Sequence, residues 1–173
     1  MQTINVLIGL PGSHKTQYAG YLIDKNKNAV IVSHDNIREM INGRYCFDDE
    51  QEEVVRKIAN HAMRELLLCG KDLIVDDSLV SINMVCRRQL TRYLRAIVYR
   101  NHPVIISAVQ FDVDIVRSKE ARMADGKGLS GSHWRTAIDK IAALYEPVTG
   151  GEIGEFGFDN CIILPPYKEW KLL

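Results

Sequence analysis

Short apolar runs alternate along the chain with longer segments in which apolar residues recur every three or four positions. Continuous apolar runs bounded by turn residues are typical of buried strands, and the longer spacing is typical of amphipathic helices. Residues 50–68 show the helical spacing most clearly, with apolar residues at 54, 55, 58, 59, 62, 63, 66 and 67. The pattern predicts strands over 3–9, 29–33, 72–76, 103–111 and 160–164. It predicts helices over 15–25, 35–42, 50–68, 82–99, 113–121 and 133–145, and a loop over 124–132, which is rich in glycine and serine.

The alternation of strands and helices predicts an α/β fold. Strands that are apolar throughout are buried on both faces, so we expect about five parallel strands with helices on both sides, a three-layer sandwich. The length of 173 residues fits a single domain over residues 1–173, with a small lid. Ligands of such sheets bind beyond the carboxyl ends of the strands, so the residues that follow each strand are the functional candidates.

Composition narrows the class of protein. Apolar residues make up 46% and charged residues 25%, which excludes a disordered, collagen-like or disulfide-stapled chain. Lys plus Arg and Asp plus Glu both number 22, so a nucleic-acid partner would have to be recognised by a local patch. No apolar run approaches the roughly 18–20 residues of a membrane span, and no signal peptide is apparent. We expect a cytoplasmic protein with no membrane partner, in which Cys46, Cys69, Cys86 and Cys161 are reduced.

The first predicted strand leads into Gly9-Leu-Pro-Gly-Ser-His-Lys-Thr16, which follows the phosphate-loop pattern GxxxxGK[ST] with one change. His14 stands where the second glycine is expected, and its imidazole either weakens phosphate binding or supplies an extra donor. Lys15 is expected to neutralise the β- and γ-phosphates, and the Thr16 hydroxyl to bind Mg²⁺. The predicted nucleotide-binding residues of this loop are Gly9, Pro11, Gly12, Ser13, His14, Lys15 and Thr16. The alternative is a loop that merely resembles a phosphate loop.

The second predicted strand is followed by His34, Asp35 and, three residues further, Arg38. A carboxylate at this position can accept a proton from an acceptor hydroxyl, and an arginine one helical turn along can bind an anionic acceptor group or the transferring phosphoryl. His34 could orient Asp35. The alternative is that Asp35 caps the helix and Arg38 is solvated.

The third predicted strand ends in Asp76-Asp77-Ser78. A carboxylate at this place is where phosphate-loop proteins hold Mg²⁺ or its water. We favour Asp76 over Asp77 as the magnesium-side residue, because the apolar run leads directly into it. The alternative is an ordinary charged turn.

With residues 9–16, the segment His-Asp-Asn-Ile-Arg at 34–38 and the segment Ile-Val-Asp-Asp-Ser-Leu at 74–79 in place, the chain resembles the P-loop kinases of the polynucleotide kinase type over residues 3–165. The spacing of Lys15, Asp35 and Arg38 is similar to that in the 5′-kinase domain of phage polynucleotide kinase. The resemblance, which extends to zeta-toxin-like phosphotransferases, implies a P-loop NTPase fold that uses ATP and Mg²⁺. It also implies that Asp35 is the general base and that Arg38 touches an acceptor phosphate.

The resemblance further implies a lid with arginines before the last helix, here approximately residues 117–133. Arg122 is the candidate for stabilising the transferring phosphoryl, with Arg117 and Lys127 as further candidates. Arg117 and Arg122 are also expected to bind ATP. The loop is longer than the family spacing, and a second lid arginine is absent unless Lys127 takes its place. The alternative is a solvated basic helix.

Between residues 78 and 111 there are five arginines, at 87, 88, 92, 95 and 100, and no acidic residue. Arg88, Arg92 and Arg95 share one face of the predicted helix and could bind a nucleic-acid backbone, unless they form an ordinary solvated face. The acidic residues at 48, 49, 50, 52 and 53 are interpreted as helix N-terminal charges without a catalytic role. Trp134 and Trp170 are expected to be packing residues.

These features predict an ATP-dependent kinase whose catalytic residues are Lys15, Asp35, Arg38 and Arg122. The basic helix favours a nucleic-acid acceptor, either a polynucleotide 5′-hydroxyl or a hydroxymethylated base in DNA. One alternative is a kinase of small molecules, such as a nucleoside, a metabolite or a sugar nucleotide. Another is a nucleotide-binding module with little turnover.

Overall fold

Five parallel strands form one sheet in the order β2-β3-β1-β4-β5. The computed structural model describes residues 1–98, 103–124, 131–154 and 157–165. The strands are β1 (Gln2–Ile8), β2 (Ala29–Val32), β3 (Asp72–Asp76), β4 (Val104–Gln110) and β5 (Asn160–Ile163). The α/β fold predicted from the sequence is therefore confirmed, with each strand within about one residue of its predicted place.

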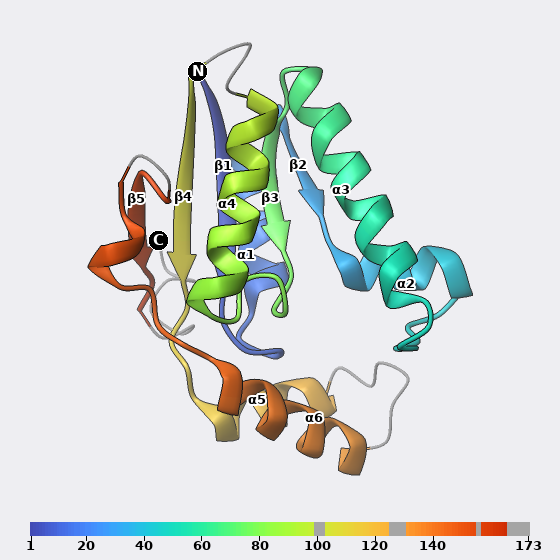
Figure 1. Ribbon diagram of the computed structural model, residues 1–173. Coiled ribbons are helices and arrows are strands. Elements are labelled where there is room, and N and C mark those ends of the chain that lie inside the picture. The colour runs from blue at the N-terminus through green and yellow to red at the C-terminus, as the bar shows by residue number, and fades with distance from the viewer. Residues whose placement is uncertain (99–102, 125–130, 155–156, 166–173) are drawn as a thin grey trace.

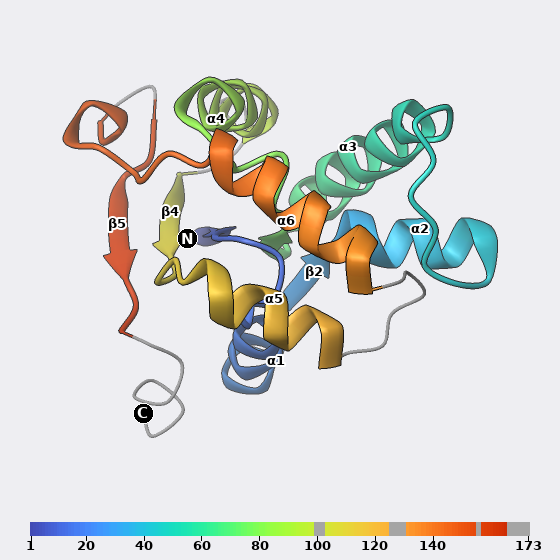
Figure 2. The ribbon, with the colours of Figure 1, turned by 90° about the horizontal axis from the view of Figure 1, so that it is seen from below.

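Helices cover both faces of the sheet (Figures 1 and 2). Helix α1 (Lys15–Lys25) lies on one face, and α3 (Glu52–Leu68) and α4 (Met84–Val98) lie on the other. The alternation of side chains along β1 explains the two cores. Ile4, Val6 and Ile8 pack with α3 and α4, whereas Leu7 packs with α1.

Three helices gather at the carboxyl end of the sheet. They are α2 (His34–Asn42), α5 (Ile115–Ala124) and α6 (Gly131–Leu144). Helices α5 and α6 pack against each other and lie across that end, as Figure 2 shows from below. The predicted lid falls on these two helices, and residues 125–130, with Lys127, lie outside the described residues. Helix α6 begins two residues before its predicted start, because glycine and serine are well tolerated at a helix N-terminus.

A buried ion pair ties the segment that follows α6 to α4. Arg87 is fully buried, and its guanidinium donates to both carboxylate oxygens of Glu152, at 2.6 and 2.8 Å. It also donates to the carbonyls of Ser81, Glu146 and Pro147. Burial would raise the pKa of Glu152, but the hydrogen bonds from Arg87 and from the Thr149 backbone outweigh it and hold that pKa below its usual value.

The segment also contains a short 3₁₀ turn, η1 (Gly150–Glu152), before the chain enters β5. All four cysteines are free thiols. Among the described residues, no helix has the length and apolar character that a membrane crossing requires.

Candidate active site

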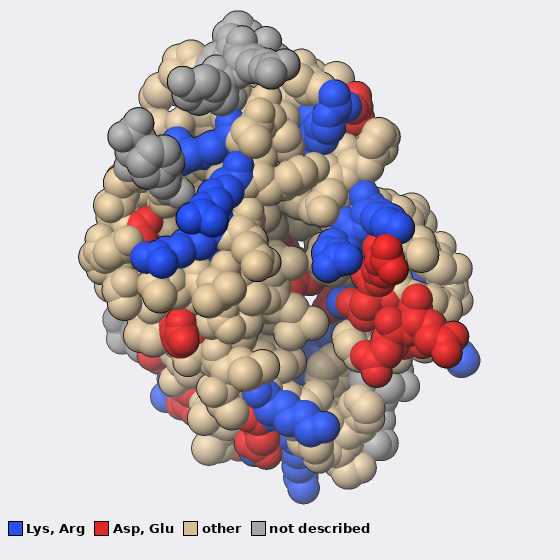
Figure 3. Space-filling model, in the orientation of Figure 1, with Lys and Arg blue, Asp and Glu red and all other residues tan. Residues whose placement is uncertain are grey.

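A cavity of about 1490 Å³ opens at the carboxyl end of the sheet. It lies between the loop that follows β1, the segment joining α2 to α3, and the lid helices. Figure 3 shows the hollow between the α4 side and the α3 side of the molecule. Its lining includes these sequence-predicted residues: Pro11, Gly12, His14, Lys15, Thr16, Asp35, Arg38, Asp76 and Arg122. Gly9 and Ser13 belong to the same loop, but they do not line the cavity.

Lys15 begins α1 and points its ammonium group back into the loop. Its Nζ donates to the carbonyl oxygens of Gly9, at 3.0 Å, and of Leu10, at 2.8 Å. Burial lowers the pKa of Lys15, and the carboxylates of Asp76, Asp77 and Asp35 oppose that shift. The loop therefore holds a buried cation beside three acidic groups, as a binding site for phosphate and a metal ion requires.

Two residues of the loop adopt backbone conformations that glycine favours. Gly12 has φ 84°, and a β-carbon there would lie 2.3 Å from the carbonyl oxygen of Ser118 in α5. Glycine is required here because the loop and the lid helix come so close. His14 has φ 66° at the N-terminus of α1, a left-handed conformation that costs a side-chain-bearing residue about 1–2 kcal/mol. The substituted position thus keeps the backbone shape that a glycine would adopt without strain.

Thr16 and Asp76 meet across the site. The Thr16 hydroxyl donates to Oδ2 of Asp76 at 2.8 Å. Burial raises the pKa of Asp76, although Lys15 and the Thr16 hydrogen bond counteract it. A hydroxyl and a carboxylate side by side supply oxygen ligands of the kind that Mg²⁺ prefers, and Mg²⁺ usually completes its shell with waters and substrate phosphates. In the described part of the chain, no cluster of three or more His, Cys, Asp or Glu offers a metal site.

Asp77 has a different set of partners. Its Oδ1 accepts hydrogen bonds from the backbone N–H groups of Leu79 and Val80, and its Oδ2 lies 3.0 Å from Nδ1 of buried His34. Burial would raise the pKa of Asp77, but these contacts lower it overall. His34 therefore contacts Asp77 and joins the start of α2 to the end of β3. The expectation that His34 orients Asp35 has no support in these contacts.

Each carboxylate oxygen of Asp35 accepts a hydrogen bond from a different arginine. Nη1 of Arg38 lies 2.7 Å from Oδ1, and Nη2 of Arg122 lies 3.0 Å from Oδ2. Asp35 is not the cap of α2, because the side chain of Ser33 occupies that role. Arg38 is not solvated either, since its side chain is only 4% exposed. The two alternatives weighed from the sequence at these positions are thus wrong.

Glu52, at the start of α3, is a site residue that the sequence analysis missed. Its carboxylate accepts from Nε of Arg38 at 2.7 Å and from Nη2 at 2.6 Å, and the ring of Phe47 covers the same guanidinium at 5.4 Å. Burial would lower the pKa of Arg38, but hydrogen bonding to Glu52 and the charges of Asp77 and Asp35 raise it overall. The interpretation of this acidic residue as a helix-end charge was incomplete, because its partner lies in α2.

Arg122 of α5 contacts two aromatic rings that also contact each other. Its guanidinium carbon lies 4.2 Å from the ring centre of Trp134 and 5.4 Å from that of Tyr45. The two rings are 5.6 Å apart, and Trp134 is buried, as expected for a packing residue. Nε of Arg122 is buried without a hydrogen-bond partner among the described residues. Burial raises the pKa of Tyr45 to about 12, with the Asp35 charge adding to that shift.

Several predicted binding residues lie away from the cavity. Arg117 is exposed and pairs with Asp114 at 3.1 Å, so it does not line the site. Arg88 and Arg92 are exposed on α4, and Arg95 is bound to the carbonyl of Gly157 and to Asp159. Figure 3 shows basic side chains over α4, to the left of the hollow. The structure therefore does not bring the three α4 arginines to the candidate site as an acceptor surface.

Of four further residues singled out in the sequence, the structure describes one. Arg87, one of the five arginines noted between residues 78 and 111, is a buried structural residue. Arg100, Lys127 and Trp170 lie outside the described residues.

The fold and the site together define a P-loop NTPase of kinase-like architecture. A family model described as an AAA domain matches residues 4–146, and the chain belongs to that family. The resemblance to P-loop kinases seen in the sequence is thereby confirmed. None of the curated proteins compared with this chain matches it.

Solved structures share the fold. A chain in the Pnkp1/Rnl/Hen1 RNA repair complex aligns with a TM-score of 0.58 and 24% identity, over 83% of this chain and 45% of that one. A fungal RNA kinase aligns with a TM-score of 0.64 and 15% identity, over 95% and 74%. A sugar kinase from Janibacter sp. HTCC2649 aligns with a TM-score of 0.56 and 19% identity, over 99% and 93%. The chain spans less than half of the two matching chains from the RNA repair complex, at 45% and 38% of their lengths.

Proposed function

We propose that the protein is an ATP-dependent phosphotransferase that moves the γ-phosphate of ATP to a hydroxyl group. The observation that carries this proposal is the position of Asp35. Its carboxylate lies in the same cavity as Lys15, Thr16 and Asp76, and it is held by arginines from α2 and α5. The kinases among the structural neighbours support the same class of reaction.

The residues present fit ATP and Mg²⁺. Lys15 and the backbone N–H groups at the start of α1 would hold the phosphates, since a helix N-terminus and a buried cation both attract anions. Thr16 and Asp76 would hold the metal ion, which neutralises phosphate charge when bound. The strained backbone at His14 preserves the shape of the loop, so the replacement of glycine does not argue against nucleotide binding.

On the acceptor side, the oxygen of the acceptor hydroxyl would bond to the γ-phosphorus while the bond between that phosphorus and the oxygen of the leaving ADP breaks. Asp35 would accept the proton that the hydroxyl loses. Arg122 would stabilise the negative charge of the transferring phosphoryl, a role in which an arginine can supply a rate factor of ~10³ or more. Tyr45 and Trp134 keep the guanidinium in the cavity. Arg38 would position Asp35, with Glu52 holding Arg38 in turn.

Two acceptor classes are candidates. A polynucleotide 5′-hydroxyl is favoured by the fungal RNA kinase and the RNA repair complex among the structural neighbours, whereas a hydroxymethylated base in DNA stays a candidate from the sequence alone. A small alcohol is favoured by the sugar kinase, whose length the chain nearly matches, and by the distance of the α4 arginines from the cavity.

The test is transfer of labelled γ-phosphate from Mg²⁺-ATP onto a panel of acceptors. The panel contains 5′-hydroxyl RNA and DNA, DNA with hydroxymethylated pyrimidines and blocked ends, nucleosides and sugars. ATP binding is measured in parallel by calorimetry. Lys15→Met should abolish transfer, whereas Lys27→Met, a matched change at an exposed lysine, should not. ATP binding without transfer to any acceptor would overturn the phosphotransferase and favour a low-turnover module.

A further inference from the structure

Arg38, which the family resemblance predicts to contact an acceptor phosphate, is already paired with two carboxylates of the protein. All three of its nitrogens donate to carboxylates: Nε and Nη2 to Glu52, and Nη1 to Asp35, at 2.6–2.7 Å. The face of the guanidinium lies against Phe47, and the side chain is 4% exposed. Paired with two carboxylates and buried, Arg38 offers an incoming anion little net positive charge, and three of its five N–H donors are already engaged.

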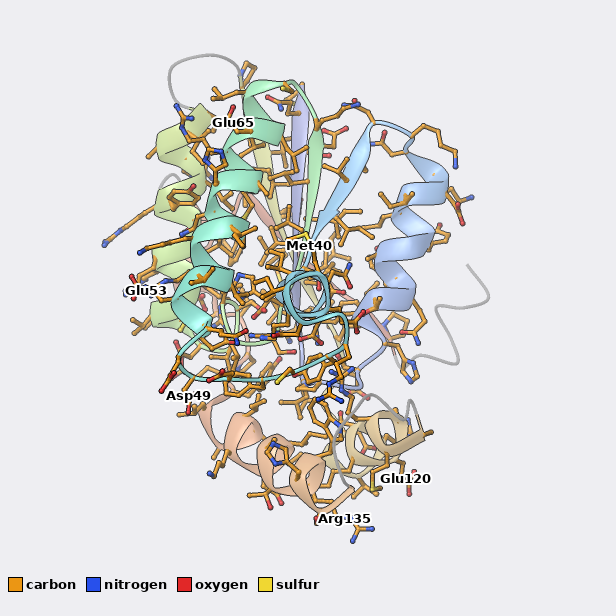
Figure 4. The ribbon with its side chains drawn as sticks, turned by 90° about the vertical axis from the view of Figure 1, so that its right-hand side faces the viewer. Met40, Asp49, Glu53, Glu65, Glu120 and Arg135 are labelled. Atoms are coloured by element: carbon orange, nitrogen blue, oxygen red, sulfur yellow. The ribbon has the colours of Figure 1, made fainter. Side chains whose placement is uncertain are left out.

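The wall of the cavity beside Arg38 is acidic. The segment between α2 and α3 contributes Asp48, Asp49 and Glu50 to the lining, and among the described residues none of the three has a salt-bridge partner. Figure 3 shows acidic side chains gathered next to the hollow, and Figure 4 labels Asp49 on the segment that joins α2 to α3. Phe47, on the same segment, adds a partly exposed ring.

The other cations of the cavity belong to elements away from this wall. Lys15 belongs to the phosphate loop, and Arg122 belongs to α5, where its Nη2 is bound to Asp35. Lys140 lines the cavity from α6, on the lid and not on the α2–α3 segment. An anionic acceptor that enters beside Arg38 would therefore meet Asp48, Asp49 and Glu50, which have no salt-bridge partner among the described residues, and repulsion between like charges in a partly buried site is strong.

We infer that the acceptor is an alcohol with no phosphate or carboxylate next to its reacting hydroxyl, and that it is a neutral, ring-bearing compound that can lie against Phe47. This inference rests on the proposed phosphotransferase function and names its substrate class. The reaction is the one given above: the hydroxyl oxygen bonds to the γ-phosphorus, ADP leaves, and the proton passes to Asp35. A nucleoside or an unphosphorylated sugar satisfies the requirement, whereas a 5′-hydroxyl with a 3′-phosphate on the same sugar does not.

The experiment compares acceptors that differ by one phosphate. Each pair keeps the same free hydroxyl: a nucleoside with its 3′-monophosphate, and a sugar with its monophosphate. We expect kcat/KM to favour the neutral member of each pair by about tenfold or more, with a gap that narrows as salt is added. Equal use of both members, or preference for the phosphorylated one, would overturn the inference and leave the phosphotransferase standing. Transfer to none of the acceptors, with ATP bound, would overturn the proposed function itself.

Two variants test the cause of the preference. Glu52→Gln removes a countercharge from Arg38, so it should lower the preference for the neutral acceptor whatever it does to the overall rate. The double change Asp48→Asn and Asp49→Asn should act in the same direction. Glu53→Gln is the matched control, since Glu53 is exposed on the outside of α3 and pairs with Lys57. If both the Glu52 and the loop variants keep the full preference, charge at this wall does not set acceptor choice.

Discussion

Arg122 of the lid and Asp35 of α2 form an ion pair across the cavity, with Nη2 3.0 Å from Oδ2. The pair joins the group proposed to stabilise the phosphoryl to the group proposed to accept the proton. A donor phosphate near Lys15 could share Arg122 with Asp35, because Nε of that guanidinium has no hydrogen-bond partner among the described residues. The same contact thus connects the donor side of the site to the acceptor side.

The proton-accepting role of Asp35 predicts a sharp loss in the Asp35→Asn variant. An amide keeps the size of the side chain but cannot take a proton, so kcat should fall by about 10²–10⁴. ATP affinity, measured by calorimetry, should stay near the original value. Asp24→Asn, at an exposed position of α1, is the control and should behave like the original protein. Turnover near the original level in Asp35→Asn would refute the assignment.

The contact between the Trp134 ring and the Arg122 guanidinium predicts that Trp134 acts on turnover by positioning Arg122. Trp134→Phe keeps a ring under the guanidinium and should change kcat by only a small factor. Trp134→Leu removes the cation–π contact, worth about 2 kcal/mol when desolvated, and should lower kcat by about tenfold or more at similar KM for ATP. Thermal unfolding of both variants separates this effect from loss of fold. Equal kcat in the two variants would show that the ring has no positioning role.

The left-handed backbone at His14 predicts an order of stability among its variants. His14→Gly removes the strain of a β-carbon at φ 66°, whereas His14→Ala keeps it. We expect the glycine variant to be more stable than the alanine variant by about 1 kcal/mol in urea unfolding. Gly20→Ala, in the middle of α1 with open space around it, should show the opposite sign. An alanine variant as stable as the glycine one would mean that position 14 is unstrained.

The buried pair of Arg87 and Glu152 predicts a large loss of stability when either charge is removed. Arg87→Met leaves Glu152 buried without its partner and should cost about 3–5 kcal/mol, whereas Arg88→Met on the exposed face should stay within about 0.5 kcal/mol. A cost below about 1 kcal/mol for Arg87→Met would contradict the structural role.

The same pair also predicts the pH dependence. The pKa of Glu152 is lowered on folding, so its stabilisation is present above the unfolded pKa of about 4.3 and is lost as pH falls through the folded pKa. The stability gap between the original protein and Glu152→Gln should therefore narrow in acid.

The exposed arginines of α4 give a direct test of nucleic-acid binding. Arg88→Glu and Arg92→Glu together reverse two charges without touching the buried pair or the Arg95 contacts. We expect phosphorylation of a small acceptor to be unchanged. A salt-dependent loss of affinity for 5′-hydroxyl RNA or DNA, absent for nucleosides, would instead show that this face binds a polynucleotide.

Much of the fold could be predicted because its signals are local. The apolar runs gave the five strands, and the pattern from Gly9 to Thr16 marked the phosphate loop at the end of β1. Asp35, Asp76 and Arg122 were found by their place after strands or by family resemblance, and the structure brings them to one cavity. Their chemical roles stay predictions.

The partners of these residues could not be predicted, because they come from contacts distant in sequence. Glu52 is 14 residues from Arg38, and Glu152 is 65 residues from Arg87. A signal for the burial of Arg87 did exist: it precedes Leu90 by three positions and Leu94 by seven, which places it on the apolar face of α4. Arg87 was grouped with Arg88 and Arg92 by charge alone, although Arg87 lies on a different face of the helix from those two residues.

The ties made by Arg87 have a mechanical consequence for the lid. Arg87 holds the carbonyls of Glu146 and Pro147, and the backbone N–H of Glu146 donates to the Ile82 carbonyl, just beyond the end of α6. That end of the helix is a fixed pivot on the body of the protein. If the cavity widens by a swing of α6 about this end, Ser132, His133 and Trp134 move farthest, because they lie near the opposite end of the helix. These three residues also line the cavity, so such a swing would change its width where they lie.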